Sequence, residues 1–150
     1  MKNKTIFSVS LLSIVLLIAL FSCKKSDETV DNDLTGLNGL WRTTVFGGEN
    51  DTLIVSINTT TANGVITYIN KKAMADSKFA VNDILFTGIK SSGNSSYTAT
   101  GTYRYGSGNA NIGHTSASLK MNSSNILFVH YSADMSTGIS PPDYYYYKIQ

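Results

Sequence analysis

The sequence predicts an all-β domain, an antiparallel up-and-down barrel of eight strands, with a β-sandwich as the competing architecture. After residue 36 there is no long stretch with a helical period. That part of the chain instead consists of short β-branched and aromatic runs separated by Gly, Asn, Asp and Ser, a pattern typical of strands joined by turns. The links are mostly short, which favours pairing of consecutive strands and closure into a barrel over a sandwich.

The expected strands follow one another through the whole domain. They cover residues 40–46, 52–58, 64–70, 84–90, 96–105, 112–122, 125–132 and 144–149. Residues 60–64, 91–94 and 123–124 have the composition of hairpin connections. Residues 71–78 are the one segment in which we expect a helix, of one or two turns.

The hairpin around Ser123-Ser124 allows an expected register. We assume that Asn122 lies opposite Asn125, which sets the pairing of the two strands. Residues that lie opposite each other on paired strands share a face of the sheet. The residues then expected to face the interior are Ala117, Leu119, Met121, Ile126, Phe128 and His130. His114 would face the other side. In the strand at 96–105 two alternatives stay open: either Tyr97, Tyr103 and Tyr105 point inward, or Thr98, Thr100 and Arg104 do.

Residues 1–22 have the features of an export signal. A short basic start containing Lys2 and Lys4 precedes an apolar run of about 16 residues, which is too short for a comfortable membrane span of about 30 Å. A basic start, an apolar centre and a small residue at the end are typical of a secretory signal peptide.

The end of this signal, Leu20-Phe21-Ser22-Cys23, resembles the lipobox of bacterial lipoproteins. The resemblance implies cleavage before Cys23, acylation of that residue and anchoring in the envelope of a Gram-negative bacterium. Lys24, rather than an Asp, follows the Cys, and this implies the outer membrane. The periplasmic face and the cell surface remain alternatives for its orientation.

Removal of residues 1–22 changes the charge of the protein. The chain has 12 basic and 10 acidic side chains, and the signal takes away two lysines, which leaves 10 of each. Such a balance argues against nucleic-acid binding, and a single Cys excludes an intrachain disulfide. We expect residues 23–35 to form a disordered, acylated tether and residues 36–150 to form the domain.

Gly39-Leu40-Trp41 stands at the start of the first expected strand and resembles the G-x-W motif of the lipocalin family. An Asn82-Asp83 turn before a hydrophobic strand and an aromatic final strand extend the resemblance over residues 36–150. It implies a barrel in which Trp41 closes one end while the other end opens on a ligand cavity. The family's late Arg, which packs over the Trp, has no counterpart in the last strand.

The sequence predicts no catalytic, metal or cofactor site. His114 and His130 are expected on different strands and opposite faces, and no carboxylate cluster accompanies either one. No Gly-x-Ser-x-Gly motif is present. We therefore expect a protein that is not an enzyme.

Two binding functions remain. The first is the binding of a small apolar or amphipathic ligand inside the barrel. It requires a cavity of at least about 300 Å³. Its expected lining is Trp41, Leu119, Met121, Phe128 and His130. The alternative is an accessory module of a cell-surface complex that contacts glycan or protein. Its expected contact residues are Tyr144, Tyr145, Tyr146 and Tyr147, two on each face of their strand.

Overall fold

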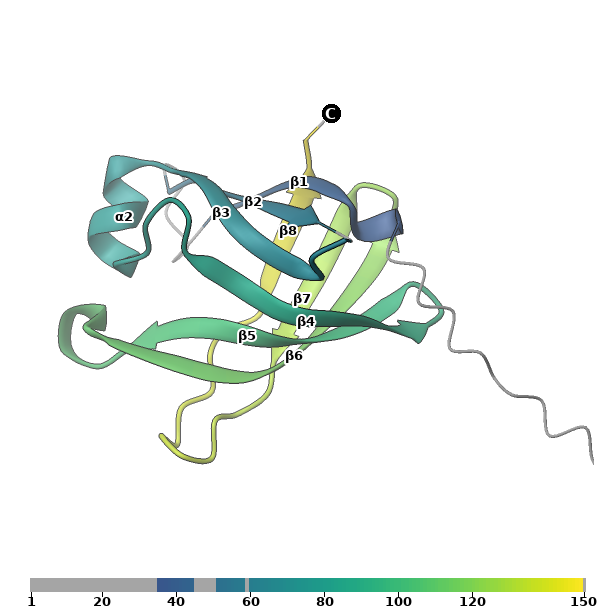
Figure 1. Ribbon diagram of the computed structural model, residues 1–150. Helices are drawn as coiled ribbons and strands as arrows, with labels where there is room; N and C mark the ends of the chain where they lie inside the picture. The colour runs from purple at the N-terminus through teal and green to yellow at the C-terminus, as the bar shows by residue number, and fades with distance from the viewer. Residues whose placement is uncertain (1–34, 45–50, 59, 150) are drawn as a thin grey trace, which may run out of the picture.

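The computed structural model describes residues 35–44, 51–58 and 60–149, and it confirms the predicted barrel (Figure 1). Each strand pairs antiparallel with the next, and β8 pairs back with β1, so the sheet is closed and a sandwich is excluded. The strands are β1 Gly39–Thr43, β2 Leu53–Asn58, β3 Asn63–Ile69, β4 Ile84–Gly93, β5 Ser96–Tyr105, β6 Asn111–Ser123, β7 Ile126–Tyr131 and β8 Tyr144–Lys148. The helical elements are η1 Thr35–Leu37, α2 Lys71–Ser77 and η2 Ser107–Asn109.

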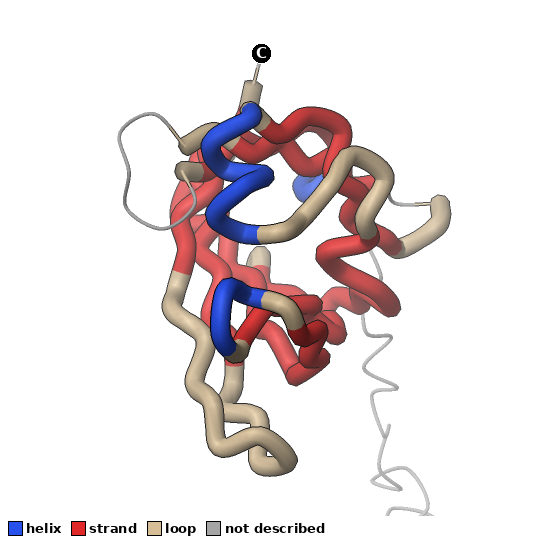
Figure 2. Tube along the Cα trace, turned by 90° about the vertical axis from the view of Figure 1, so that its left-hand side faces the viewer, coloured by secondary structure: helices blue, strands red, loops and turns tan. Residues whose placement is uncertain are grey.

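The helix expected at 71–78 is present as α2 and has defined ends. The side chain of Asn70 accepts a hydrogen bond from Ala73 N at 2.8 Å, which satisfies a free amide of the first turn. Lys78 ends the helix in the left-handed conformation, and its amide donates to Met74 O. Figure 2 looks at the barrel end on which α2 and η2 lie, with the long β7–β8 loop at the lower edge.

The expected register between β6 and β7 is wrong by one residue. Leu119 lies opposite Val129, and Lys120 lies opposite Phe128. The register shifts between Met121 and Ser123, where a bulge adds a residue to β6. Because side chains alternate along a strand, this offset sends Phe128 and His130 to the outer face, and their expected inward orientation is wrong.

Residues of opposite parity on β7 fill the interior instead. Leu127 and Val129 are fully buried and Tyr131 is 3% exposed. His114 and His130 both face outward, so their expected placement on opposite faces is also wrong. On β5, Tyr97 and Tyr103 are buried, which decides for the inward-tyrosine alternative, although Tyr105 is only half-buried.

Two glycines make room for interior tyrosine rings. A Cβ atom on Gly101 would lie 2.4 Å from Cε1 of Tyr131, and one on Gly113 would lie 2.3 Å from Cζ of Tyr103. No larger residue fits at either position without displacing the ring. The barrel interior is therefore a packed core rather than an open channel.

One end of the barrel is closed by η1 and Trp41. The Trp41 side chain is fully buried, and its Nε1 donates to Leu37 O at 2.8 Å. Lys148, from β8, places its Nζ 5.3 Å from the Trp41 ring centroid and donates to Gly36 O at 3.4 Å. We call this end the floor, and the end with α2 and η2 the mouth.

Candidate functional site

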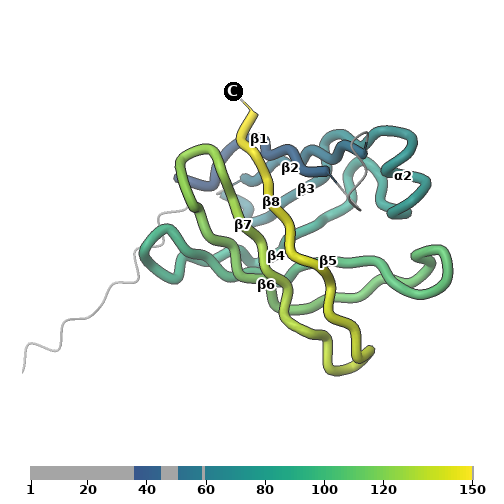
Figure 3. The backbone as a smooth tube through the Cα atoms, turned by 180° about the vertical axis from the view of Figure 1, so that it is seen from behind, coloured from purple at the N-terminus to yellow at the C-terminus, as the bar shows by residue number. Residues whose placement is uncertain are grey.

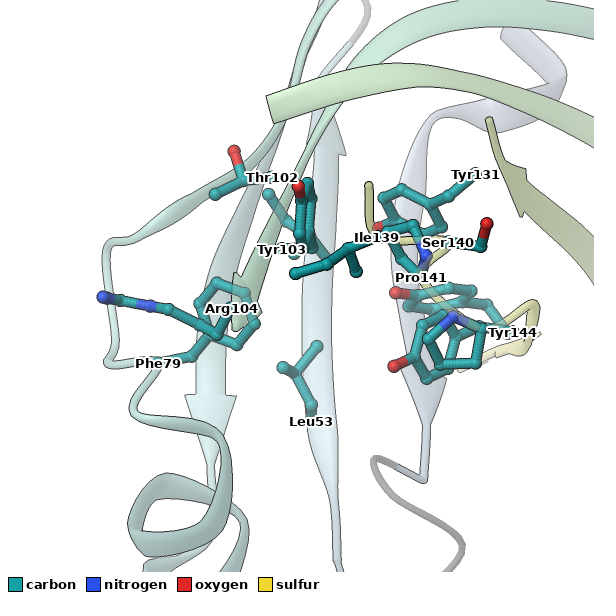
Figure 4. A pocket seen from close by; sticks show the side chains of 13 residues that line it. Leu53, Phe79, Thr102, Tyr103, Arg104, Tyr131, Ile139, Ser140, Pro141 and Tyr144 are labelled. Carbon is teal, nitrogen blue, oxygen red and sulfur yellow. The ribbon is translucent and has the colours of Figure 1, made fainter. Parts of the chain in front are cut away.

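A pocket of about 110 Å³ lies at the mouth of the barrel (Figure 4). Its walls come from strands on several sides of the barrel and from the β7–β8 loop, residues 132–143. The lining residues are Leu53, Phe79, Leu85, Thr102, Tyr103, Arg104, Tyr131, Ile139, Ser140, Pro141, Pro142, Tyr144 and Tyr146. We call this the mouth pocket. It is smaller than the cavity of about 300 Å³ that a ligand carried inside the barrel requires, and the interior is filled, so any ligand has to sit at the mouth rather than inside the barrel.

Three tyrosines form one side of the mouth pocket. The rings of Tyr131 and Tyr144 meet edge to face, with centroids 6.0 Å apart, and the side chains of Tyr131 and Tyr146 are hydrogen-bonded. Burial raises the pKa of Tyr144 to about 12 and raises the pKa values of Tyr131 and Tyr146 as well. All three hydroxyls therefore stay protonated at neutral pH, where they can exchange hydrogen bonds with a ligand.

Arg104 stands at another edge of the mouth pocket (Figure 4). Its guanidinium lies 5.3 Å from the Phe79 ring centroid, and its Nη2 lies 3.5 Å from Asp83 Oδ2. Its Nε is buried and has no hydrogen-bond partner among the described residues. A buried donor without a partner costs free energy.

The β7–β8 loop is fastened over the mouth by Asp134. The Tyr103 hydroxyl donates to Asp134 Oδ2 at 2.5 Å, and both the amide and the hydroxyl of Ser136 donate to Oδ1. Hydrogen bonds from Ser136, followed by the one from Tyr103, lower the pKa of Asp134 to about 2. The amide of Asp134 also donates to Ile139 O at 2.7 Å, so the loop folds back and carries Ile139 into the pocket wall.

The tyrosines of β8 alternate as predicted. Tyr144 and Tyr146 line the mouth pocket, while Tyr145 and Tyr147 face outward and are each 50% exposed. Of the four, therefore, only Tyr145 and Tyr147 are surface aromatic residues.

None of the five residues expected to bind a barrel ligand lines the mouth pocket. Trp41 and Leu119 are fully buried core residues, and Met121 is half-buried, with its sulfur 4.0 Å from the Tyr97 hydroxyl. Phe128 packs outside against Tyr145 with ring centroids 5.0 Å apart. His130 Nδ1 lies outside at 2.7 Å from Asp143 Oδ1.

Sequence reasoning missed the pocket because its residues are scattered along the chain. Tyr103 and Tyr131 had an aromatic signal, but they lie on β5 and β7, which β6 separates, so no single hairpin register brings them together. The β7–β8 loop had a weaker one, Pro141-Pro142 just before the aromatic strand, which marks a rigid entry into β8.

Other classes of site receive no support from the described residues. Among them, no three His, Cys, Asp or Glu side chains gather closely enough to hold a metal ion. No helix in the described ranges is both long and apolar enough to span a bilayer. Cys23 and the expected tether up to residue 34 lie outside the described residues.

Comparison with known protein families, with curated proteins and with solved structures gives no match for this chain. The resemblances to lipoproteins and lipocalins therefore rest on the motifs in the chain itself.

Proposed function

We propose that this protein is a non-enzymatic envelope lipoprotein, anchored through an acylated Cys23, whose barrel mouth binds a small amphipathic ligand. The observation that carries the binding proposal is the mouth pocket: a concave site with apolar walls and a few convergent polar groups, which is the usual form of a small-molecule site. The closed floor, with Trp41 beneath the Lys148 ammonium, supports the lipocalin-like interpretation, since Lys148 takes the place of that family's late Arg.

The volume of the mouth pocket narrows the class of ligand. An enclosed apolar cavity of about 150 Å³ holds benzene, and the mouth pocket, at about 110 Å³, is smaller, so a short branched chain fits inside it and a single ring would enter it only in part. A larger molecule would have to extend out of the mouth. The hydroxyls of Tyr144 and Tyr146 at the pocket wall favour a ligand with one polar end.

The lining chemistry supports binding rather than catalysis. Tyr131, Tyr144 and Tyr146 are protonated at neutral pH, as tyrosines ordinarily are, and burial raises their pKa values further, which makes them poor general bases. Asp134, the carboxylate that holds the loop over the pocket, accepts hydrogen bonds from Tyr103 and Ser136 on both oxygens.

The anchor and the pocket would lie at opposite ends of the barrel. The described chain begins at η1, on the floor, whereas α2 lies at the other end of the barrel (Figure 1). The mouth pocket is at the same end as α2. A tether running from Cys23 to η1 would hold the floor toward the lipid. The mouth would then face away from the membrane and remain accessible.

Native mass spectrometry of the protein extracted from its host membranes tests both halves of the proposal. We expect the mass of acyl chains at Cys23 and, in addition, a small adduct that dissociates on mild activation. Cys23→Ala should lose the acyl mass and leave the membrane fraction. Retention of the variant in membranes would refute the anchor, while an adduct-free wild-type protein would count against the ligand.

A further inference from the structure

The outer face of β8 carries three shallow hollows that meet at one residue. They have volumes of about 390, 250 and 330 Å³. Tyr147 lines all three of them, and Arg42, directly opposite it on β1, lines two. Figure 3 views the barrel from the side on which β8 crosses in front. These hollows lie outside the barrel and are distinct from the mouth pocket. Only the largest hollow shares lining residues with the mouth pocket, namely Pro142 and Tyr144.

Two aromatic rings stand in a row on this face. Tyr145 and Tyr147 are two residues apart on β8 and therefore point the same way, about 7 Å apart along the strand. Each is 50% exposed. Phe128 packs against Tyr145 with ring centroids 5.0 Å apart, which restrains the ring. The face thus offers two partly exposed phenol rings, one of which is held in place before any ligand arrives.

Polar groups surround these rings. Arg42 and Thr52 lie on one side of Tyr147, and Asp143 lies on the other. The Asp143 carboxylate is held by His130 at 2.7 Å, and Thr43 Oγ1 donates to Tyr145 O at 2.8 Å, which fixes the strand. Hydrogen-bond donors and acceptors therefore border the aromatic surface on both edges.

The combination of exposed phenol rings with neighbouring charged side chains favours one class of ligand. A purely apolar ligand would strip water from Arg42 and Asp143 without replacing their hydrogen bonds, which is costly. A sugar ring has one apolar face that can lie on a phenol ring and a rim of hydroxyls that can donate and accept. The two larger hollows, of about 390 and 330 Å³, fall in the lower part of the volume range of small-molecule sites.

We propose that the β8 outer face is a carbohydrate-binding site, in which sugar rings stack on Tyr147 and Tyr145 while their hydroxyls bond to Arg42 and Asp143. This site is independent of a ligand in the mouth pocket. It gives the anchored domain a second binding surface, suited to a glycan chain of two or more units.

Affinity electrophoresis of the full chain in mild detergent tests this proposal. The native gels would each contain one soluble polysaccharide: amylopectin, xylan, mixed-linkage β-glucan, galactomannan, dextran or pectin. We expect at least one of them to retard the wild-type protein. Tyr147→Ala should weaken that retardation by roughly tenfold in apparent Kd, because it removes the ring shared by all three hollows. Tyr147→Phe should keep most of the binding.

Tyr68→Ala is the matched control. Tyr68 is 49% exposed on the outer surface of β3 and lines none of the three hollows, so its loss should leave the retardation unchanged. The proposal is overturned if none of the six polysaccharides retards the wild-type protein. It is equally overturned if Tyr147→Ala binds as well as the wild-type protein does, or if Tyr68→Ala loses as much affinity as Tyr147→Ala.

Discussion

Trp41 shows how a single residue closes the barrel. Its ring is fully buried, its Nε1 ties η1 to the first strand, and Lys148 covers it from the last strand. These two contacts join the beginning and the end of the described domain. The role of Trp41 was predictable from its motif, whereas Lys148 was not, because a lone Lys in an aromatic strand has no distinguishing sequence context.

We expect Trp41→Ala to lower the free energy of unfolding by about 3–5 kcal/mol, since it leaves a large cavity and frees Leu37 O. Leu40→Ala, at a neighbouring position that is 42% exposed, should cost less than about 1 kcal/mol. Urea unfolding of the domain without its signal and anchor measures both. Equal losses for the two variants would mean that Trp41 does not hold the floor.

At the scale of elements, the positions of the strands were predictable from the sequence. Which residues of each strand face the interior was only partly predictable. Alternation of apolar and polar residues placed all eight strands within a few residues, apart from positions 45 and 46, which lie outside the described residues. The inward face of β7 was not predictable, because the bulge between Met121 and Ser123 has no clear sequence signal. One added residue turned Phe128 outward and Tyr131 into the mouth pocket.

The β7–β8 loop gives a prediction about pH. The pKa of Asp134 is about 2 in the folded protein and about 3.9 in an unfolded chain. A carboxyl with a lowered pKa stabilises the fold fully above its unfolded pKa, and this contribution disappears as the pH falls toward the folded pKa. Unfolding free energy should therefore decline between about pH 4 and pH 2.

Asp134→Asn should remove part of this decline, because the carboxyl that titrates in that window is gone. Urea titrations at several pH values between 2 and 7 measure the effect. An unaltered decline in Asp134→Asn would show that the fastening of the loop does not depend on that carboxylate.

At the scale of the whole molecule, three features lie on separate parts of the barrel. The described chain begins at η1 on the floor, the mouth holds the pocket, and the outer face of β8 carries the exposed tyrosines. The sequence predicted the barrel and the alternation of residues 144–147 but not which tyrosines face inward. It also did not predict the pocket, which forms only where β2, β4, β5, β7, β8 and the β7–β8 loop converge.

The central claim, a small amphipathic ligand in the mouth pocket, is tested most directly by NMR titration with p-cresol, a single ring with one hydroxyl. We predict saturable shifts at the amides of Leu85, Tyr131 and Ser140, with a Kd near the millimolar range, given the few atoms buried. Ile139→Trp, which fills the pocket, should weaken binding at least roughly tenfold. Met135→Trp, at a 92% exposed position of the same loop, should not. Absence of shifts in the wild-type protein, or equal shifts in Ile139→Trp, would contradict the account.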